Sequence, residues 1–170
     1  MRTYTQKVVA IVAIVAIVAV VAGGCSGALN EPPSGTRLEL HRFRSDGASF
    51  TYVSGMRQSE RLIVRDAATW LDRWASISNS IPSQPAPNVN FATQMIVVAA
   101  LGERNSGGYS IRVDSALRTA EGLTIWIGTI SAGAHCGTVT MLTQPVDIAS
   151  LTRVNGAVRF IDVPSVVDCE

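Results

Sequence analysis

The sequence is poor in the residues that most often carry catalysis or bind nucleic acid. It has two histidines, three cysteines and a single lysine, Lys7. No His-Glu-x-x-His, Cys-x-x-Cys or Gly-x-Ser-x-Gly motif occurs, so no recognisable zinc site or nucleophile elbow is present. With 14 basic and 13 acidic residues, the formal net charge is +1. This balance gives no electrostatic reason to expect binding to nucleic acid.

The one long apolar run lies at the N-terminus. It spans residues 8–22, follows two basic residues and ends in small residues before Cys25. A basic region, an apolar region and small residues before the cut are the order of a secretory signal peptide. A Cys at the cut resembles a bacterial lipobox, although Ala22 stands three residues before it where Leu is usual. The resemblance implies that residues 1–24 are removed and that Cys25 becomes a lipid-modified N-terminus.

An uncleaved anchor is the alternative, although 15 apolar residues fall short of the roughly 20 that a spanning helix needs. Both interpretations place the rest of the chain in the cell envelope, facing the periplasm or the exterior. Because Ser26, and not the Asp that commonly retains lipoproteins at the inner membrane, follows the Cys, we expect the outer membrane where one exists. Residues 25–36 are polar and rich in Gly and Pro, which indicates a flexible tether. Residues 37–170 then suffice for one domain.

Assigning Cys25 to lipid leaves Cys136 and Cys169 in an oxidising compartment, where disulfides persist. We therefore predict one disulfide between them, and two unpaired thiols are the alternative. A His135–Cys136 nucleophile is disfavoured, because neighbours in a strand point to opposite faces and a disulfide removes the thiolate. No catalytic residue, metal ligand or cofactor is predicted from the remaining sequence.

The apolar periodicity predicts an α+β fold, mainly antiparallel β, as a sandwich or partly closed sheet with one packed amphipathic helix. The helix is expected over residues 67–78 with Asp66 as its N-cap. Trp70, Leu71, Trp74 and Ile77 form its apolar face, which we interpret as a packing face and not as a sugar-stacking platform. Asp72 and Arg73 are expected to point away from that face. Strands are predicted at residues 37–43, 49–53, 61–65, 94–101, 109–114, 123–127, 138–143 and 157–161.

Several short segments occur in a recognisable order along the chain. They are Asn90-Phe91, Leu101-Gly102-Glu103-Arg104, Gly107-Gly108-Tyr109, Thr143-Gln144-Pro145 and Val158-Arg159-Phe160. With the two Trp residues four apart in the preceding helix, they resemble the PrcB C-terminal domain family of protease-complex subunits. The resemblance covers roughly residues 62–160. It departs at residues 146–148, where the family commonly has an aromatic residue or His.

The resemblance implies a non-catalytic subunit that stabilises or assembles a partner protein, a secreted or surface protease. We place the partner contacts on Glu103, Arg104, Gly107, Gly108 and Tyr109; the alternative for Tyr109 is an ordinary core-facing aromatic. Independently of the family, the two glycines supply the φ > 0 that a tight connection needs. A phosphate-binding loop is excluded, because neither Lys-Ser/Thr nor a helix follows them. The rival functions are a structural envelope lipoprotein without a dedicated partner and, least favoured, a hydrolase.

Overall fold

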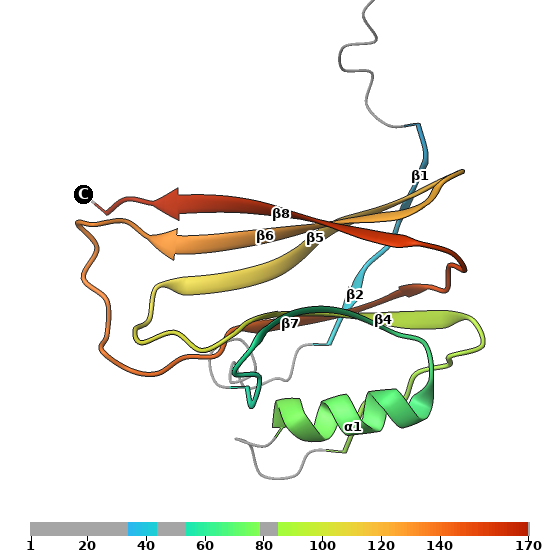
Figure 1. The fold of residues 1–170 in the computed structure, drawn as a ribbon, viewed down its shortest axis with the longest axis horizontal. Coiled ribbons are helices and arrows are strands. Elements are labelled where there is room, and N and C mark those ends of the chain that lie inside the picture. The colour runs from blue at the N-terminus through green and yellow to red at the C-terminus, as the bar shows by residue number, and fades with distance from the viewer. Residues whose placement is uncertain (1–33, 44–53, 79–84, 170) are drawn as a thin grey trace, which may run out of the picture. The chain divides into compact units, whose positions relative to one another are not determined.

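The computed structural model describes residues 34–43, 54–78 and 85–169, which form two stacked four-stranded sheets and one helix (Figure 1). Sheet A has the strand order β1-β5-β6-β8 and sheet B the order β2-β7-β4-β3. All pairs are antiparallel except β6 and β8, which run parallel. The predicted α+β sandwich is therefore confirmed. The elements are β1 (Thr36–Leu38), β2 (His41–Arg42), β3 (Ser59–Val64), α1 (Ala67–Ile77), β4 (Gln94–Leu101), β5 (Tyr109–Thr119), β6 (Gly122–Ala132), β7 (Val146–Thr152) and β8 (Val158–Val167).

Helix α1 begins and packs as its sequence predicts. The Thr69 backbone N–H donates to Asp66 Oδ1 at 2.8 Å and the Thr69 hydroxyl donates to Oδ2 at 2.9 Å. These hydrogen bonds stabilise the carboxylate and lower the pKa of Asp66. Trp70, Trp74 and Ile77 are buried, so the packing interpretation of the two indoles is confirmed. The expectation that Leu71 belongs to the packing face is wrong: its side chain is exposed, because it lies about 100° around the helix from Trp70.

The next two residues of α1, Asp72 and Arg73, also differ in their exposure. Asp72 is exposed, as expected. Arg73, however, turns toward sheet B, where its Nη1 lies 3.3 Å from Glu60 Oε2 on β3. The expectation that Arg73 points away from the packing side is therefore wrong, because its long side chain reaches the adjacent strand edge.

Sheet B is covered on both faces. Its central strand β4 has seven consecutive buried residues from Met95 to Leu101. Ile96, Val98 and Ala100 pack with the α1 side chains, whereas Met95 and Val97 face sheet A. A strand apolar on both faces is therefore the signature of this doubly covered position, as the sequence predicts.

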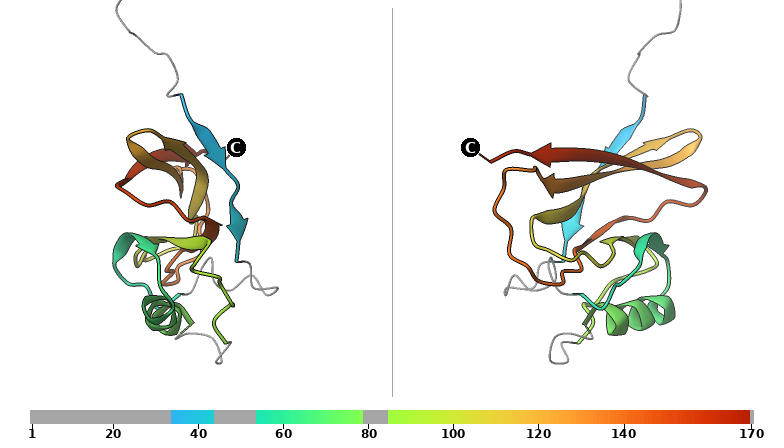
Figure 2. Two further views of the ribbon diagram at one scale, coloured as in Figure 1. Left: turned by 90° about the vertical axis from the view of Figure 1, so that its right-hand side faces the viewer. Right: turned by 60° about the vertical axis from the view of Figure 1, so that its left-hand side comes forward.

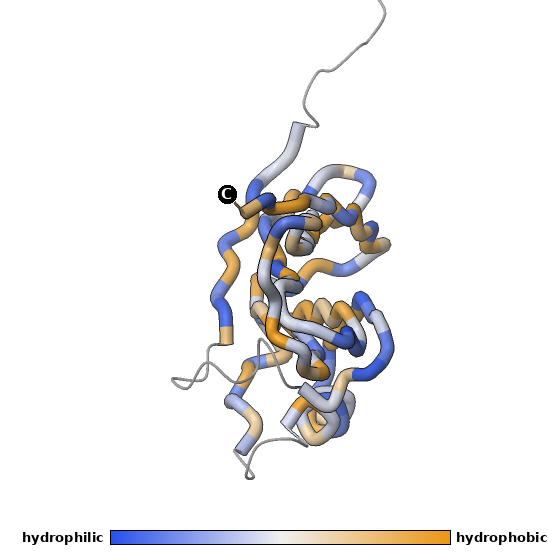
Figure 3. Tube along the Cα trace, turned by 90° about the vertical axis from the view of Figure 1, so that its left-hand side faces the viewer, coloured by the Kyte–Doolittle hydropathy of each residue, from blue (hydrophilic) through white to orange (hydrophobic). Residues whose placement is uncertain are grey.

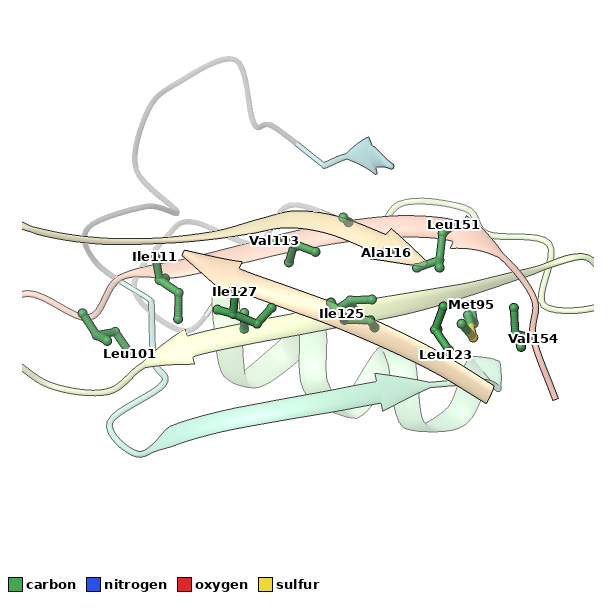
Figure 4. Packing of buried hydrophobic residues seen from close by; sticks show 13 residues of the cluster. Met95, Leu101, Ile111, Val113, Ala116, Leu123, Ile125, Ile127, Leu151 and Val154 are labelled. Carbon is green, nitrogen blue, oxygen red and sulfur yellow. The ribbon is translucent and has the colours of Figure 1, made fainter. Parts of the chain in front are cut away.

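Among the residues that the structure describes, sheet A is covered on its inner face only. Ile111, Val113, Ile125 and Ile127 alternate along β5 and β6 and point toward sheet B, where they form the inter-sheet core (Figure 4). Among the described residues no helix covers the outer face, as Figure 1 shows. Ile130 on that face is 42% exposed.

Two carboxylates connect the sheets. Asp147 on β7 accepts a hydrogen bond from the Val113 backbone N–H at 2.8 Å, beside a register shift in the β5–β6 pairing. It also lies 3.4 Å from Arg42 Nε. At the opposite edge, Asp162 on β8 accepts from Arg61 Nε of β3 at 3.0 Å. The first carboxylate is nearly buried and the second is exposed.

The prediction of one continuous strand over residues 37–43 is wrong. Residues 37–43 alternate in hydropathy, as Figure 3 shows, but they divide into β1 and β2. β1 pairs with β5 of sheet A and β2 pairs with β7 of sheet B, so the chain crosses between the sheets near Glu39 (Figure 2). The alternation shows which side chains face inward but not which sheet they join.

The predicted strand at residues 138–143 is also wrong. This segment makes only an isolated bridge between Thr143 and Arg104, and the following strand is β7, which was not predicted. β5, β6 and β8 are longer than predicted. The predicted strand at residues 49–53 lies outside the described residues, as do Cys25, residues 1–24 and most of the tether.

A disulfide closes the parallel β6–β8 pair. The last registered pair is Ala132 with Val167, and just beyond it Cys136 is bonded to Cys169 with a Cα–Cα separation of 4.9 Å. The predicted bridge is therefore confirmed. It ties the C-terminal strand to a segment 33 residues earlier, which limits the freedom of the unfolded chain. Within the described part of the chain, no helix is long and apolar enough to cross a membrane.

Candidate partner-binding site

The connection between β4 and β5, residues 102–108, carries the predicted site and passes from sheet B to sheet A. We call it the crossing loop. It begins at Gly102 with φ 80° and ends at Gly108 with φ 83°. A Cβ on Gly102 would lie 2.8 Å from the Ser59 backbone nitrogen, so both the conformation and the space require glycine. The prediction of a positive φ is therefore confirmed at Gly108 and wrong at Gly107. The other glycine of the crossing loop with a positive φ is Gly102.

The two adjacent glycines allow the crossing loop to approach the segment 133–142, which we call the apolar loop. The Gly107 N–H donates to the Val139 carbonyl at 2.9 Å, and a Cβ on Gly107 would lie 2.8 Å from the Val139 side chain. A Cβ on Gly108 would meet Thr138 and Ala132 equally closely. Their structural role is close packing within the chain.

Glu103 is engaged within the chain as well. Its Oε2 accepts a hydrogen bond from Gln144 Nε2 at 2.8 Å and lies 3.8 Å from Arg57 Nε. Its backbone N–H donates to the Arg57 carbonyl at 3.0 Å. These contacts fasten the crossing loop to the segments before β3 and β7.

Arg104 and Tyr109 lie together, as the predicted site requires. The guanidinium of Arg104 lies 5.7 Å from the centroid of the Tyr109 ring, a cation–π distance. The Arg104 backbone is fixed by reciprocal hydrogen bonds with Thr143 at 2.8 and 2.9 Å. Tyr109 is half-buried and packs against the inter-sheet core, so the core-facing alternative describes part of its role.

A groove of about 380 Å³ opens beside these two side chains. It exists because β6 and β8 of sheet A extend past the end of sheet B, as Figure 1 shows. The inner face of sheet A is therefore uncovered at this end, and Val166 is 64% exposed. The groove is lined by Leu101, Arg104, Tyr109, Thr129, Ile130, Ser131, Pro164, Ser165 and Val166.

The apolar loop is a feature that the sequence reasoning missed. Val139, Met141 and Leu142 are 46–65% exposed, although the loop is held by the disulfide at Cys136 and by its bonds to the crossing loop. Large apolar side chains displayed on an anchored loop are typical of interaction surfaces. The sequence signal for it is apolar residues within a Gly- and Thr-rich stretch, but their alternation is also typical of a strand.

The reactive residue types do not gather at this end of the molecule. Cys136 is occupied by the disulfide. His41 on β2 lies 3.9 Å from Glu39 and is exposed, and His135 is exposed beside the disulfide. In the part of the chain that the structure describes, no three His, Cys, Asp or Glu side chains are grouped as metal ligands.

Comparison with protein families identifies the segment that carries this site. Residues 95–152 match the model described as PrcB C-terminal. The match runs from β4 to β7 and includes both loops, so the resemblance predicted from the sequence is confirmed. The similarity of this segment to the PrcB C-terminal family suggests a subunit associated with a protease complex. No curated protein and no solved structure matches the chain.

Proposed function

We propose that this protein is a non-catalytic subunit, anchored in the cell envelope by a lipid on Cys25, that binds and stabilises a secreted or surface protease. The family match over residues 95–152 carries the proposal, because it spans the crossing loop and the apolar loop together. A partner in the same envelope compartment suits a domain that follows a signal peptide and a polar tether.

The geometry of the two loops supports a binding role. Their backbones are fixed to one another by the Gly107–Val139 and Arg104–Thr143 hydrogen bonds. Their exposed apolar side chains, among them Met141 and Leu142, are therefore held in position before a partner binds. Binding then loses less conformational entropy than it would with unanchored loops. The fixed backbones and the exposed apolar side chains support a protease contact on the two loops.

The role is proposed as non-catalytic for a chemical reason. A hydrolase needs a nucleophile or activated water beside a base, held in one site. Cys136, which adjoins His135 in the sequence, is bonded to Cys169 and offers no thiolate. A Cys136→Ser variant that folds but loses a measured turnover would restore the hydrolase interpretation.

The experiment uses the full chain, expressed in cells with an envelope protease encoded beside it. The double variant Met141→Glu with Leu142→Glu should shorten the half-life of that protease and weaken co-purification about tenfold or more, because it charges an apolar contact. Leu71→Glu, which introduces the same charge at another exposed apolar side chain, on α1, is the control for surface charge.

Equal protease half-life and co-purification in both variants would contradict the proposed interface. If the protease half-life is also unchanged when the whole gene is deleted, the alternative of a structural envelope lipoprotein is favoured. Mass spectrometry of the mature N-terminus tests the anchor separately. A lipid on Cys25 is expected, and an unmodified Cys25 or an uncut Met1 would contradict it.

A further inference from the structure

We infer that the groove between the overhanging end of sheet A and Arg104 binds an extended apolar segment of the partner protein that carries an acidic side chain. This inference rests on the proposed function and specifies the chemistry of one contact. It concerns a surface next to the two loops but distinct from the exposed side chains of the apolar loop.

The charge of the groove indicates the acidic group. Arg104 is the one ionisable cation among the residues that line it. One of its five N–H groups donates, from Nη1, to the Glu103 carbonyl at 3.3 Å, and the guanidinium lies 5.7 Å from the centroid of the Tyr109 ring. No carboxylate of a described residue lies within ion-pair distance of it, because Glu103 is turned to Gln144 and Arg57. The guanidinium is thus positioned with donors left for a carboxylate, which it can bind through two parallel hydrogen bonds.

The backbone of the crossing loop favours an acidic side chain over a chain terminus. Proteins usually capture a terminal carboxylate in a nest of free backbone N–H groups. Here the N–H groups of Glu103, Arg104 and Gly107 already donate to carbonyls within the chain. The charged group left to recognise the carboxylate is therefore the guanidinium of Arg104.

An extended segment suits the groove, whose volume is about 380 Å³. In an extended segment every second side chain points to the same side, so the acid and the residues two positions away can face the groove together. The wall formed by Leu101, Pro164 and Val166 is apolar and suits the side chains that flank the acid in an extended segment.

The edge of β8 disfavours a second copy of this chain as the occupant. Leu123 N–H donates to the Ala157 carbonyl and Gly133 N–H to the Val167 carbonyl, so odd-numbered β8 residues bond to β6. Even-numbered residues then direct their backbone groups to the free edge, and one of them is Pro164, which has no N–H to donate. A proline on an edge strand interrupts the continuous ladder that edge-to-edge pairing of copies would need.

Selection from a random peptide library displayed on phage tests the inference with the folded domain. On the wild type we expect enrichment of Asp or Glu flanked by apolar residues. A synthetic copy of the selected peptide should bind about tenfold or more weakly once its acid is replaced by the matching amide. The Arg104→Glu variant should lose that peptide to a similar extent and should itself select Lys or Arg at the same position.

The matched control is Arg118→Glu, which makes the same charge change on an exposed residue at the other end of β5. It should bind the selected peptide as the wild type does. Val166→Ser should keep the acidic preference and lose the preference for apolar flanks. Circular dichroism and Tm of each variant report whether it is folded.

Three results would overturn the inference. They are no acidic enrichment on the wild type, the same selected motif on Arg104→Glu, and self-association by sedimentation that Arg104→Glu abolishes. Any of them can occur while the apolar-loop variants still shorten the protease half-life. Failure of the groove and failure of the proposed function are therefore distinguishable.

Discussion

Strand β4 of sheet B and strand β6 of sheet A cross the middle of the same sandwich, yet their surroundings differ. β4 is enclosed by the inter-sheet core on one face and by α1 on the other, whereas β6 alternates between buried and half-exposed residues. The two sheets therefore differ in how accessible they are to a partner. In the described part of the chain, sheet B with α1 is the more enclosed, and sheet A leaves an uncovered face and an overhanging end where a partner has access.

The two sheets are also held by different means. Sheet B relies on apolar packing on both sides, which contributes in proportion to the area removed from water. Sheet A lacks the second apolar layer among the described residues. The Cys136–Cys169 bridge closes its parallel pair, and Asp147 and Asp162 connect it to sheet B.

The largest expected effect comes from one substitution made on the outward faces of both sheets. Ile96→Ala on β4 removes a fully buried side chain packed with α1 and should lower the free energy of unfolding by about 2–5 kcal/mol. Ile130→Ala on β6 removes a partly exposed one and should cost about 1 kcal/mol or less. Urea unfolding of the two variants measures the difference.

Equal losses of unfolding free energy in Ile96→Ala and Ile130→Ala would contradict this difference between the sheets, because they would mean that the outer face of sheet A is covered. Repeating the measurement at several protein concentrations separates the two explanations. A cost at Ile130 that grows with concentration would indicate that self-association covers this face.

A smaller effect is expected from the two inter-sheet carboxylates. Asp147→Ala leaves the Val113 N–H without its acceptor and should cost about 1–3 kcal/mol. Asp162→Ala breaks an exposed ion pair with Arg61 and should cost about 1 kcal/mol or less. Asp147→Asn, which keeps an accepting oxygen, should recover part of the loss. If thermal unfolding ranks Asp162 above Asp147, the sheets are joined chiefly at the β3–β8 edge.

The elements that the sequence predicts well are those whose signal is local. β4 is a continuous apolar run, and α1 combines an N-cap with Trp residues at helical spacing. β7 was missed because it includes the polar residues Asp147 and Ser150. The structure satisfies both through partners far along the chain, the Val113 N–H and the His41 carbonyl. The parallel pairing of β8 likewise depends on a distant strand.

The candidate site likewise has one part that the local sequence predicts and one part that depends on distant segments of the chain. The motif around residues 101–109 was local and led to Arg104 and Tyr109, which do lie together. The groove beside them requires Pro164 and Val166, which β8 brings there from the other end of the domain. The apolar loop remained hidden because alternation of Val139 and Met141 is typical of a strand. Only the disulfide and the bonds to the crossing loop explain why it is not one.

The smallest expected effect concerns the cap that begins α1, on the enclosed side of the comparison. The pKa of Asp66 is lowered below 3.8 in the folded protein by the Thr69 hydrogen bonds, so its contribution to stability is fully present above that pH. The contribution is lost as the pH falls through the folded pKa. Asp66→Ala should therefore lower Tm at pH 7, and its deficit relative to the wild type should shrink below about pH 3.8.

Asp66→Asn is the matched control for this prediction, because its side-chain oxygen accepts from Thr69 at any pH. It should stay close to the wild type at pH 7 and should not repeat the pH-dependent change. Hydrogen exchange should place the Asp66→Ala loss in α1 and β4, since the helix packs on sheet B. A Tm deficit that is the same at pH 3 and pH 7 would contradict the contribution of the charged cap. Exchange that increases first in β6 and β8 would mean that α1 supports both sheets and that the two are less independent than their packing indicates.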